Sequence, residues 1–167
     1  MVGTIVFLFF PAAMAAAACI DFFTLTIPNR LSIGFAVLFF PAALVAGLPL
    51  HDIGMHVLAA AAMLAVGVAL FAFGWIGGGD AKFFAATALW LGWPHLLPYI
   101  VWFSLVGGGL SLALVVARRM PIPLLVAHAE WALRLHDRRN GVPYGVALAA
   151  AGLIVYPATI WTAVMTG

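Results

Sequence analysis

Residues 53–82 read IGMHVLAAAAMLAVGVALFAFGWIGGGDAK. Residues 53–76 contain no lysine, arginine, aspartate or glutamate, and they exceed the roughly 20 apolar residues that a helix needs to cross a bilayer. Three glycines follow, and after them come the carboxylate of Asp80 and the amine of Lys82. This stretch therefore predicts a transmembrane helix that ends in a glycine-rich, polar turn.

The rest of the chain has the same apolar character. Hydrophobic residues make up 66% of the 167 residues and charged residues only 7%, whereas soluble domains contain about 25% charged residues. A bundle of about six helices would use nearly the whole chain, so we expect one membrane-embedded domain over residues 1–167. The seven Lys and Arg residues are too few and too scattered to suggest nucleic-acid binding.

Successive apolar runs define the expected helices. Five of them are long enough to span: 2–20, 31–50, 53–76, 96–117 and 142–165. The run 83–93 is shorter and reaches only about half of the ~30 Å hydrocarbon core. Pro94 and Pro98 argue against its fusion with the next run, because proline removes a backbone donor and disfavours helix at the preceding residue. We predict an all-α polytopic bundle of about six transmembrane helices, with one short helix after the glycine run.

The basic residues predict the topology. Five of them lie in one loop, which the positive-inside rule places in the cytoplasm: Arg118, Arg119, Arg134, Arg138 and Arg139. If the short run 83–93 spans the membrane, Arg30 and Lys82 also lie on the cytoplasmic side. If it does not, the basic residues are divided between the two sides of the membrane. We therefore expect six spans with both chain ends outside the cytoplasm. Leucines alternate with charges between Pro121 and Asn140, which predicts an interfacial amphipathic helix.

Two of the five acids, Asp21 and Asp80, directly adjoin apolar runs. Two full-length runs, 31–50 and 53–76, separate them, so both acids lie on the same side of the membrane. Because lipid does not solvate charge, an ionisable group at this depth is a candidate functional residue. The alternative is that both are ordinary helix-end residues, with Asp80 capping a helix that begins near Ala81.

A pair of carboxylates offers a specific chemistry. Two carboxylates within a few ångströms in a low-dielectric site cannot both ionise, so one keeps a proton near neutral pH. The ionised group can draw a proton from water while the protonated group polarises a scissile carbonyl. Such a dyad hydrolyses peptides without a metal or cofactor, and we expect none. The glycines before Asp80 lack side chains and allow another backbone to approach closely.

Three motifs occur in an order that fits these helices: Ile27-Pro28-Asn29, then Gly77-Gly78-Gly79-Asp80-Ala81-Lys82, then Pro143-Tyr144-Gly145. On these motifs the chain resembles the type IV prepilin peptidases over nearly its whole length, and it looks like their short branch, associated with tight-adherence (Flp-type) pili. The family's two catalytic aspartates occupy the positions matched here by Asp21 and Asp80, the latter in a Gly-x-Gly-Asp motif. Two departures are the absence of the cysteine-rich zinc module of larger members and the unusually apolar stretch 22–26.

The resemblance implies an aspartic endopeptidase (hydrolase) that removes the short, positively charged leader of prepilins at the cytoplasmic face of the bacterial inner membrane. The implied partners are a Flp-type or type IV-like prepilin, the lipid bilayer and the pilus assembly machinery. In this reading Gly77, Gly78 and Gly79 shape the substrate path, and Lys82 is a secondary candidate.

Other function classes stay open. A small proton- or cation-coupled transporter could use the same two aspartates at a helix break, although such sites usually lie near the membrane midplane. In a non-catalytic assembly subunit the two acids would be interfacial caps. His51, Asp52 and His56 could suggest a metal site, but histidines five residues apart point to different helix faces, and their loop lies opposite the aspartates. We therefore expect no metal.

Overall fold

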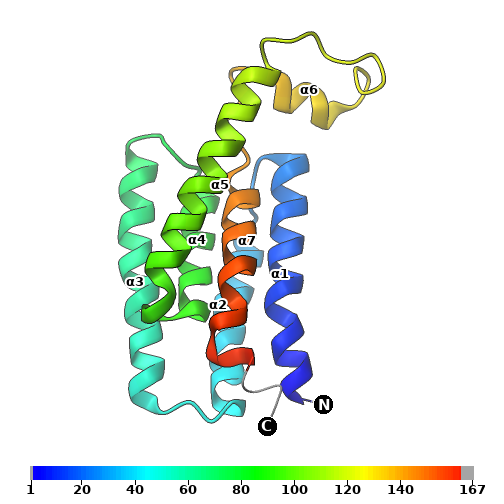
Figure 1. The fold of residues 1–167 in the computed structure, drawn as a ribbon. Helices are drawn as coiled ribbons and strands as arrows, with labels where there is room; N and C mark the ends of the chain where they lie inside the picture. Colours follow the sequence, from blue (N-terminus) through cyan, green and yellow to red (C-terminus); the bar gives the residue numbers. More distant parts are fainter. Residues whose placement is uncertain (1, 163–167) are drawn as a thin grey trace.

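The computed structural model describes residues 2–162, and every regular element within them is a helix, which confirms the predicted all-α class (Figure 1). The α-helices are α1 (Val2–Thr24), α2 (Asn29–Val45), α3 (Leu50–Ala72), α4 (Gly78–Leu91), α5 (Leu96–Ala117), α6 (Glu130–His136) and α7 (Tyr144–Val155). Two 3₁₀ turns, η1 (Trp93–His95) and η2 (Tyr156–Ala158), follow α4 and α7.

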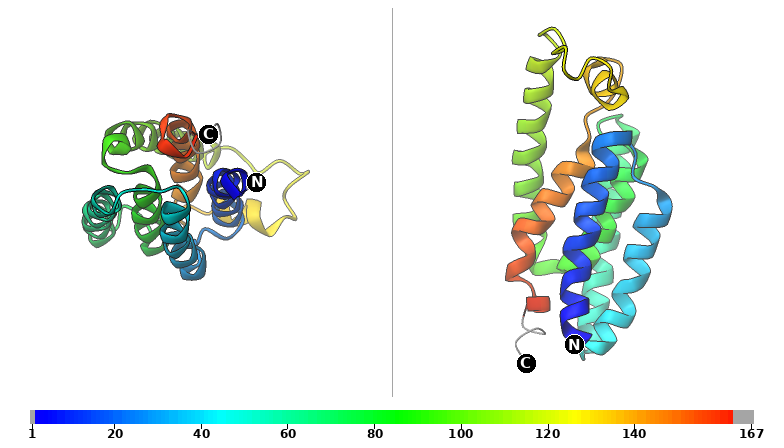
Figure 2. Two further views of the ribbon diagram at one scale, coloured as in Figure 1. Left: turned by 90° about the horizontal axis from the view of Figure 1, so that it is seen from below. Right: turned by 90° about the vertical axis from the view of Figure 1, so that its right-hand side faces the viewer.

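Six of these helices run alternately in opposite directions, and the short helix α4 lies at the centre of the bundle (Figures 1 and 2). It packs against α2, α3 and α7, and every residue from Asp80 to Leu91 is buried except Lys82. Protein rather than lipid surrounds α4, so its 14 residues need not match the thickness of the hydrocarbon core. The separation from α5 is confirmed, because Gly92 adopts a φ of 75° and η1 then contains Pro94.

Fewer helices reach spanning length than the apolar runs predicted. Within residues 2–162, three segments are long and apolar enough to cross a membrane: Phe7–Thr24, Leu50–Ala72 and Trp93–Ala117. Helix α2 has 17 residues and ends at Val45 rather than near Leu50. Gly47, at φ 70°, ends it: the Gly47 and Leu48 amides donate to the carbonyls of Leu44 and Ala43, the pattern of a glycine-terminated helix.

Helix α7 is also shorter than the predicted run 142–165. It ends at Val155, and the chain continues as the 3₁₀ turn around Pro157. Proline has no amide hydrogen and cannot continue the α-helical hydrogen-bond ladder. Residues 163–165 of the predicted run lie outside the described residues.

The predicted amphipathic helix between Pro121 and Asn140 is reduced to the seven residues of α6. Pro121 and Pro123 hold the preceding segment in turns, so the helical spacing of its leucines does not produce a helix. Within α6, Arg134 donates to Glu130, one turn earlier on the same helix, at 2.9 Å. Arg138 lies beyond the helix end.

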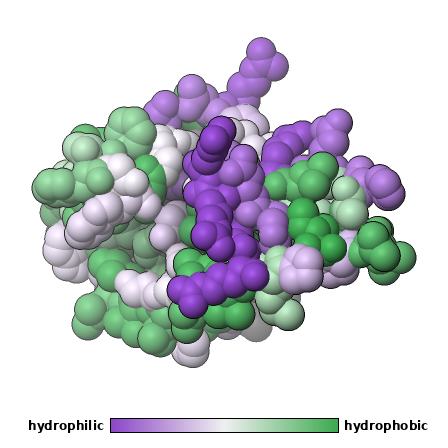
Figure 3. All heavy atoms as spheres, turned by 90° about the horizontal axis from the view of Figure 1, so that it is seen from above, coloured by the Kyte–Doolittle hydropathy of each residue, from purple (hydrophilic) through white to green (hydrophobic). Residues whose placement is uncertain are grey.

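All seven lysines and arginines lie at the end of the bundle where α2, α4 and α7 begin (Figure 1). This is the distribution expected if the short helix runs the length of the bundle in alternation with its neighbours. Figure 3 views the molecule from this end and shows hydrophilic side chains from the middle of the face to its upper edge, with hydrophobic side chains mainly at its other sides. The start of α1 and the end of α7 lie at the opposite end.

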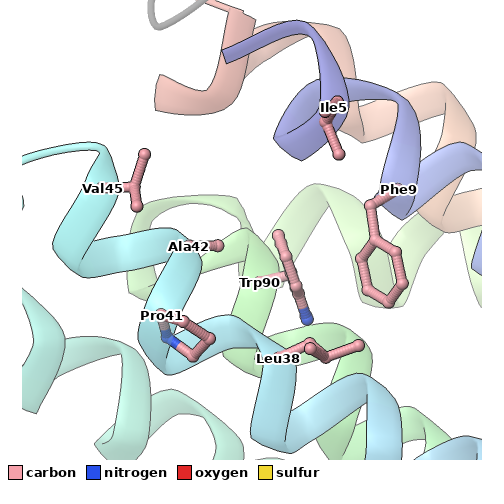
Figure 4. Close-up of a pocket in the computed structure, with 7 residues that line it drawn as sticks. All are labelled: Ile5, Phe9, Leu38, Pro41, Ala42, Val45 and Trp90. Atoms are coloured by element: carbon pink, nitrogen blue, oxygen red, sulfur yellow. The ribbon is translucent and has the colours of Figure 1, made fainter. Parts of the chain in front are cut away.

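The opposite half of the bundle contains a tryptophan-centred core. Trp90 donates to the Phe35 carbonyl at 2.9 Å, and Trp161 donates to the Trp90 carbonyl at 2.7 Å. An apolar cavity of about 210 Å³ lies beside Trp90 between α1 and α2 (Figure 4). It is lined by Ile5, Phe9, Leu38, Pro41, Ala42, Val45 and Trp90. With no titratable group in its lining, this cavity offers no acid-base chemistry.

Candidate active site

Asp21 lies in the last turn of α1, which continues beyond the predicted run 2–20. The helix continues to Thr24, and Leu25 then takes a left-handed conformation at φ 56°. That conformation costs a non-glycine residue roughly 1–2 kcal/mol, and here it turns the chain toward α2. The Asp21 side chain is 2% exposed, and its Oδ2 accepts a 2.6 Å hydrogen bond from the amide of Gly145 at the start of α7.

Asp80 lies in the first turn of α4, which begins at Gly78 rather than near Ala81. Its Oδ2 accepts a 3.1 Å hydrogen bond from the Gly77 amide, so the side chain reaches back to cap its own helix. The residue is 8% exposed. Asp80 therefore does cap its own helix, as in the alternative reading of this residue. The capping bond also fixes the orientation of its buried carboxylate.

Ile27 connects the two acidic segments. A methyl group on Gly79 would lie 2.7 Å from the Ile27 carbonyl oxygen, and one on Gly145 would lie 2.7 Å from the Ile27 Cδ1. The close backbone approach predicted for the glycine run therefore occurs, but the chain's own α1–α2 connection makes it. The segments that carry Asp21 and Asp80 therefore come together at Ile27.

The two remaining polar motif residues at this end, Asn29 and Lys82, bind each other. Lys82 Nζ donates to Asn29 Oδ1 at 2.8 Å and ties α4 to the start of α2, for which Pro28 provides the extended residue before the first turn. Two residues along a helix is more than half a turn, so Lys82 leaves α4 on the side away from Asp80. Among the described residues, no ion pair joins Lys82 to either carboxylate.

Tyr144 links α7 to α5. Ser111 Oγ donates to the Gly107 carbonyl at 2.7 Å, so in its 3.2 Å contact with Tyr144 the tyrosine hydroxyl is the donor. Pro143 precedes Tyr144 at the helix start. Ser111 was not among the predicted residues, because a lone serine in an apolar run carries no signal until its partner across the bundle is known.

A cavity of about 320 Å³ opens beside Tyr144, between the end of α3 and the face of α5. Its lining comprises Leu70, Trp75, Ile76, Phe103, Ser104, Gly107, Gly108, Ser111 and Tyr144. Ile76 directly precedes the glycine run, so the cavity reaches the segment that carries Asp80.

The histidines considered as metal ligands lie at the other end of the bundle and do not converge. His51 contacts Asp52 at 3.1 Å on the surface, whereas His56 is buried and hydrogen-bonds the Leu89 carbonyl at 2.7 Å. Within residues 2–162 no three histidine, cysteine, aspartate or glutamate residues cluster as metal ligands.

Comparison with known proteins identifies the family of the chain. A model of the type IV leader peptidase family matches residues 8–112, more than half of the chain. The match includes Asp21, Asp80 and the glycine run, whereas Pro143-Tyr144-Gly145 lies beyond it. No curated protein and no solved structure matches the chain. Because the match covers most of the helical bundle and both buried aspartates, the chain belongs to the type IV leader peptidase family, a family of membrane proteases.

Proposed function

We propose that this chain is an aspartic endopeptidase in which Asp21 and Asp80 form the catalytic pair, and that it removes the leader of Flp-type prepilins at the cytoplasmic face of the inner membrane. The observation that carries the proposal is that two buried aspartates from different helices lie in segments that both pack on Ile27, at one end of a membrane bundle. Membership of the family supports peptide hydrolysis and prepilins as the general substrate class.

The mechanism follows from the two carboxylates. One ionised carboxylate removes a proton from a water molecule as that water attacks the scissile carbonyl, and the protonated partner donates a hydrogen bond to the carbonyl oxygen. The carboxyl group that took the proton from water then passes it to the amine as the tetrahedral intermediate collapses and the C–N bond breaks. The amides of Gly145 and Gly77 hold Asp21 and Asp80 in fixed orientations, so neither carboxylate must reorganise during the reaction.

The cavity between α3 and α5 supports a path for the substrate. It lies beside the glycine run and is lined largely by apolar side chains, with Ser104, Ser111 and Tyr144 as its polar members. An extended peptide in this cavity would bring its backbone to the Asp80 side of α4. The apolar segment that follows the leader would remain at bilayer depth along α5.

The transporter alternative fits the geometry less well. Both acids lie in terminal turns of their helices, and α4 runs unbroken from Gly78 to Leu91. Ion-coupled transporters usually bind their ions near the midplane at broken helices.

The test is cleavage by the purified protein. The protein is reconstituted in lipid vesicles with a Flp-type prepilin, and the products are identified by mass spectrometry. The proposal requires a single cut between the charged leader and the apolar segment. If the protein does not cleave the prepilin but conducts protons or cations across the same vesicles, the result would refute the proposal and favour the transporter alternative.

The orientation in the membrane has its own test. In a Cys19→Ala background, Arg139→Cys provides one labelling site in the loop after α6. An impermeant thiol reagent should label it in inverted vesicles and not in intact cells. The opposite pattern would place the aspartates on the outer side.

A further inference from the structure

Three arginines converge on one cavity at the end of α5. The cavity has a volume of about 270 Å³ and is lined by Val115, Arg118, Arg119 and Arg138. It is separate from the cavity beside Tyr144, with which it shares no lining residue. Three guanidinium groups around so small a space form a strongly cationic site.

Backbone carbonyls hold two of these arginines in place. Arg118 donates from Nε to the Leu135 carbonyl at 2.7 Å and from Nη2 to the Gly141 carbonyl at 2.9 Å. Arg138 Nη2 donates to the carbonyl of Arg118 at 3.2 Å. Each guanidinium has five N–H donors, so these bonds leave donors free on both side chains. Arg118 and Arg138 are thus held in place and still have N–H donors available for a ligand.

Among the described residues, no acid of this loop forms an ion pair with the three arginines. Glu130 pairs with Arg134, and Asp137 accepts from the Arg139 amide at 2.9 Å. Across residues 2–162, no ion pair joins Arg118, Arg119 or Arg138 to an acid. The carbonyl end of α5 offers only about half an elementary negative charge, which balances less than one of the three positive charges.

The cavity lies just beyond the exposed apolar surface of α5. On α5, Leu112, Val115 and Val116 are exposed apolar residues, and the arginines begin within one turn of them. An adjoining, mainly apolar cavity of about 190 Å³ also has Arg118 in its wall, together with Leu114, Ile122 and Val126. A cationic site and an apolar space that share one arginine fit an amphiphile with a negative headgroup.

We propose that this cavity binds the phosphate of an anionic phospholipid, with Arg118, Arg119 and Arg138 as its ligands. Guanidinium groups bind phosphate oxygens in pairs of parallel hydrogen bonds. Basic clusters at the end of a transmembrane helix recognise anionic lipids in the same way. Arg118 also holds the Gly141 carbonyl, two residues before Pro143, so a bound lipid would steady the connection that leads into α7.

The test measures binding and does not depend on peptidase activity. The full-length protein, delipidated in a neutral detergent, is titrated with short-chain phosphatidylglycerol, with short-chain phosphatidylcholine and with inorganic phosphate. The proposal requires saturable binding of phosphatidylglycerol and much weaker binding of the other two. Equal affinity for inorganic phosphate would make this a free-phosphate site, and equal affinity for phosphatidylcholine would remove the preference for an anionic lipid. Either result would overturn the proposal.

Two double variants of equal charge locate the site. Arg119→Gln with Arg138→Gln should weaken phosphatidylglycerol binding about 30-fold, since each basic residue at a membrane surface contributes roughly a factor of five. Arg30→Gln with Arg139→Gln removes two charges outside the cavity and should change binding less than about threefold under the same screening. Equal losses in both pairs would show general surface attraction and refute a defined site. If the first pair fails to fold, Arg119→Gln alone serves, because its side chain donates no hydrogen bond to the described residues.

Discussion

The Gly145→Ala substitution would displace Asp21, a proposed catalytic residue, while leaving its carboxyl group chemically unchanged. The new methyl group would lie 2.8 Å from the Asp21 Cβ and Oδ2 and 2.7 Å from the Ile27 Cδ1. Carbon atoms pack at about 3.5–4.0 Å, so Asp21 and α7 must separate by roughly 1 Å. That movement lengthens or breaks the 2.6 Å hydrogen bond from the Gly145 amide to Asp21.

The expected loss of activity follows from that displacement. A hydrogen bond to a carboxylate contributes about 1.5–3 kcal/mol, and a 1 Å misplacement of a catalytic group costs about 100-fold in rate. We therefore expect leader cleavage to fall about 10- to 100-fold, and overpacking to lower the free energy of unfolding by about 1–3 kcal/mol.

The assay compares initial rates of prepilin cleavage in detergent for Gly145→Ala and Gly109→Ala. The Gly109 methyl would meet nothing within 4 Å, and Gly109 does not line the cavity beside Tyr144, so this control adds a methyl group on α5 without a clash. Thermal unfolding of each variant identifies any loss that reflects misfolding. Gly145→Ala cleaving within about threefold of the control would refute the reasoning that Gly145 positions Asp21.

Further substitutions and a chelator test other parts of the account. Gly79→Ala should lower both the melting temperature and the cleavage rate, because its methyl would lie 2.7 Å from the Ile27 carbonyl oxygen, whereas Gly78→Ala meets an aromatic ring at 3.5 Å and should behave like wild type. Tyr144→Phe should lower the free energy of unfolding by about 1 kcal/mol. When Ser111→Ala is combined with Tyr144→Phe, the free energy of unfolding should fall little further, because the first change already removes the hydrogen bond. Additive losses in a double-mutant cycle would argue against a hydrogen bond between Tyr144 and Ser111. EDTA should leave cleavage unchanged, because a pair of carboxylates activates water without a metal, and inactivation restored by a divalent cation would contradict an aspartic mechanism.

The arrangement of helices could be predicted from the sequence because two strong constraints determine it. Bilayer thickness sets the length of an apolar run, and the arginines after residue 117 mark one end of the bundle. With two long runs between them, Asp21 and Asp80 had to lie at the same end. The short run 83–93 was harder to place, since its length reflects burial among other helices rather than contact with lipid.

Helix ends and cross-bundle contacts could not be predicted to the same degree. The apolar residues after Asp21 do not indicate that α1 continues to Thr24. The helix ends where Leu25 takes a left-handed conformation, and because leucine rarely adopts that conformation, the sequence does not mark this position as a helix end. Ile27 appears in the sequence as part of a turn motif, yet its importance comes from contacts with Gly79 and Gly145, which are distant in the chain. Such contacts depend on how the helices pack, and single-sequence periodicity does not report packing.

The central claim is that Asp21 and Asp80 carry out the hydrolysis. Its most direct test is processing of a Flp-type prepilin by Asp21→Asn and Asp80→Asn, with Asp52→Asn as the control. Asp52 is an exposed aspartate at the opposite end of the bundle. The account predicts that each of the first two variants accumulates in the membrane but loses more than about a thousandfold in cleavage rate, the scale seen when one member of a catalytic unit is removed, while Asp52→Asn remains active. Processing at wild-type rates by either Asp21→Asn or Asp80→Asn would contradict it.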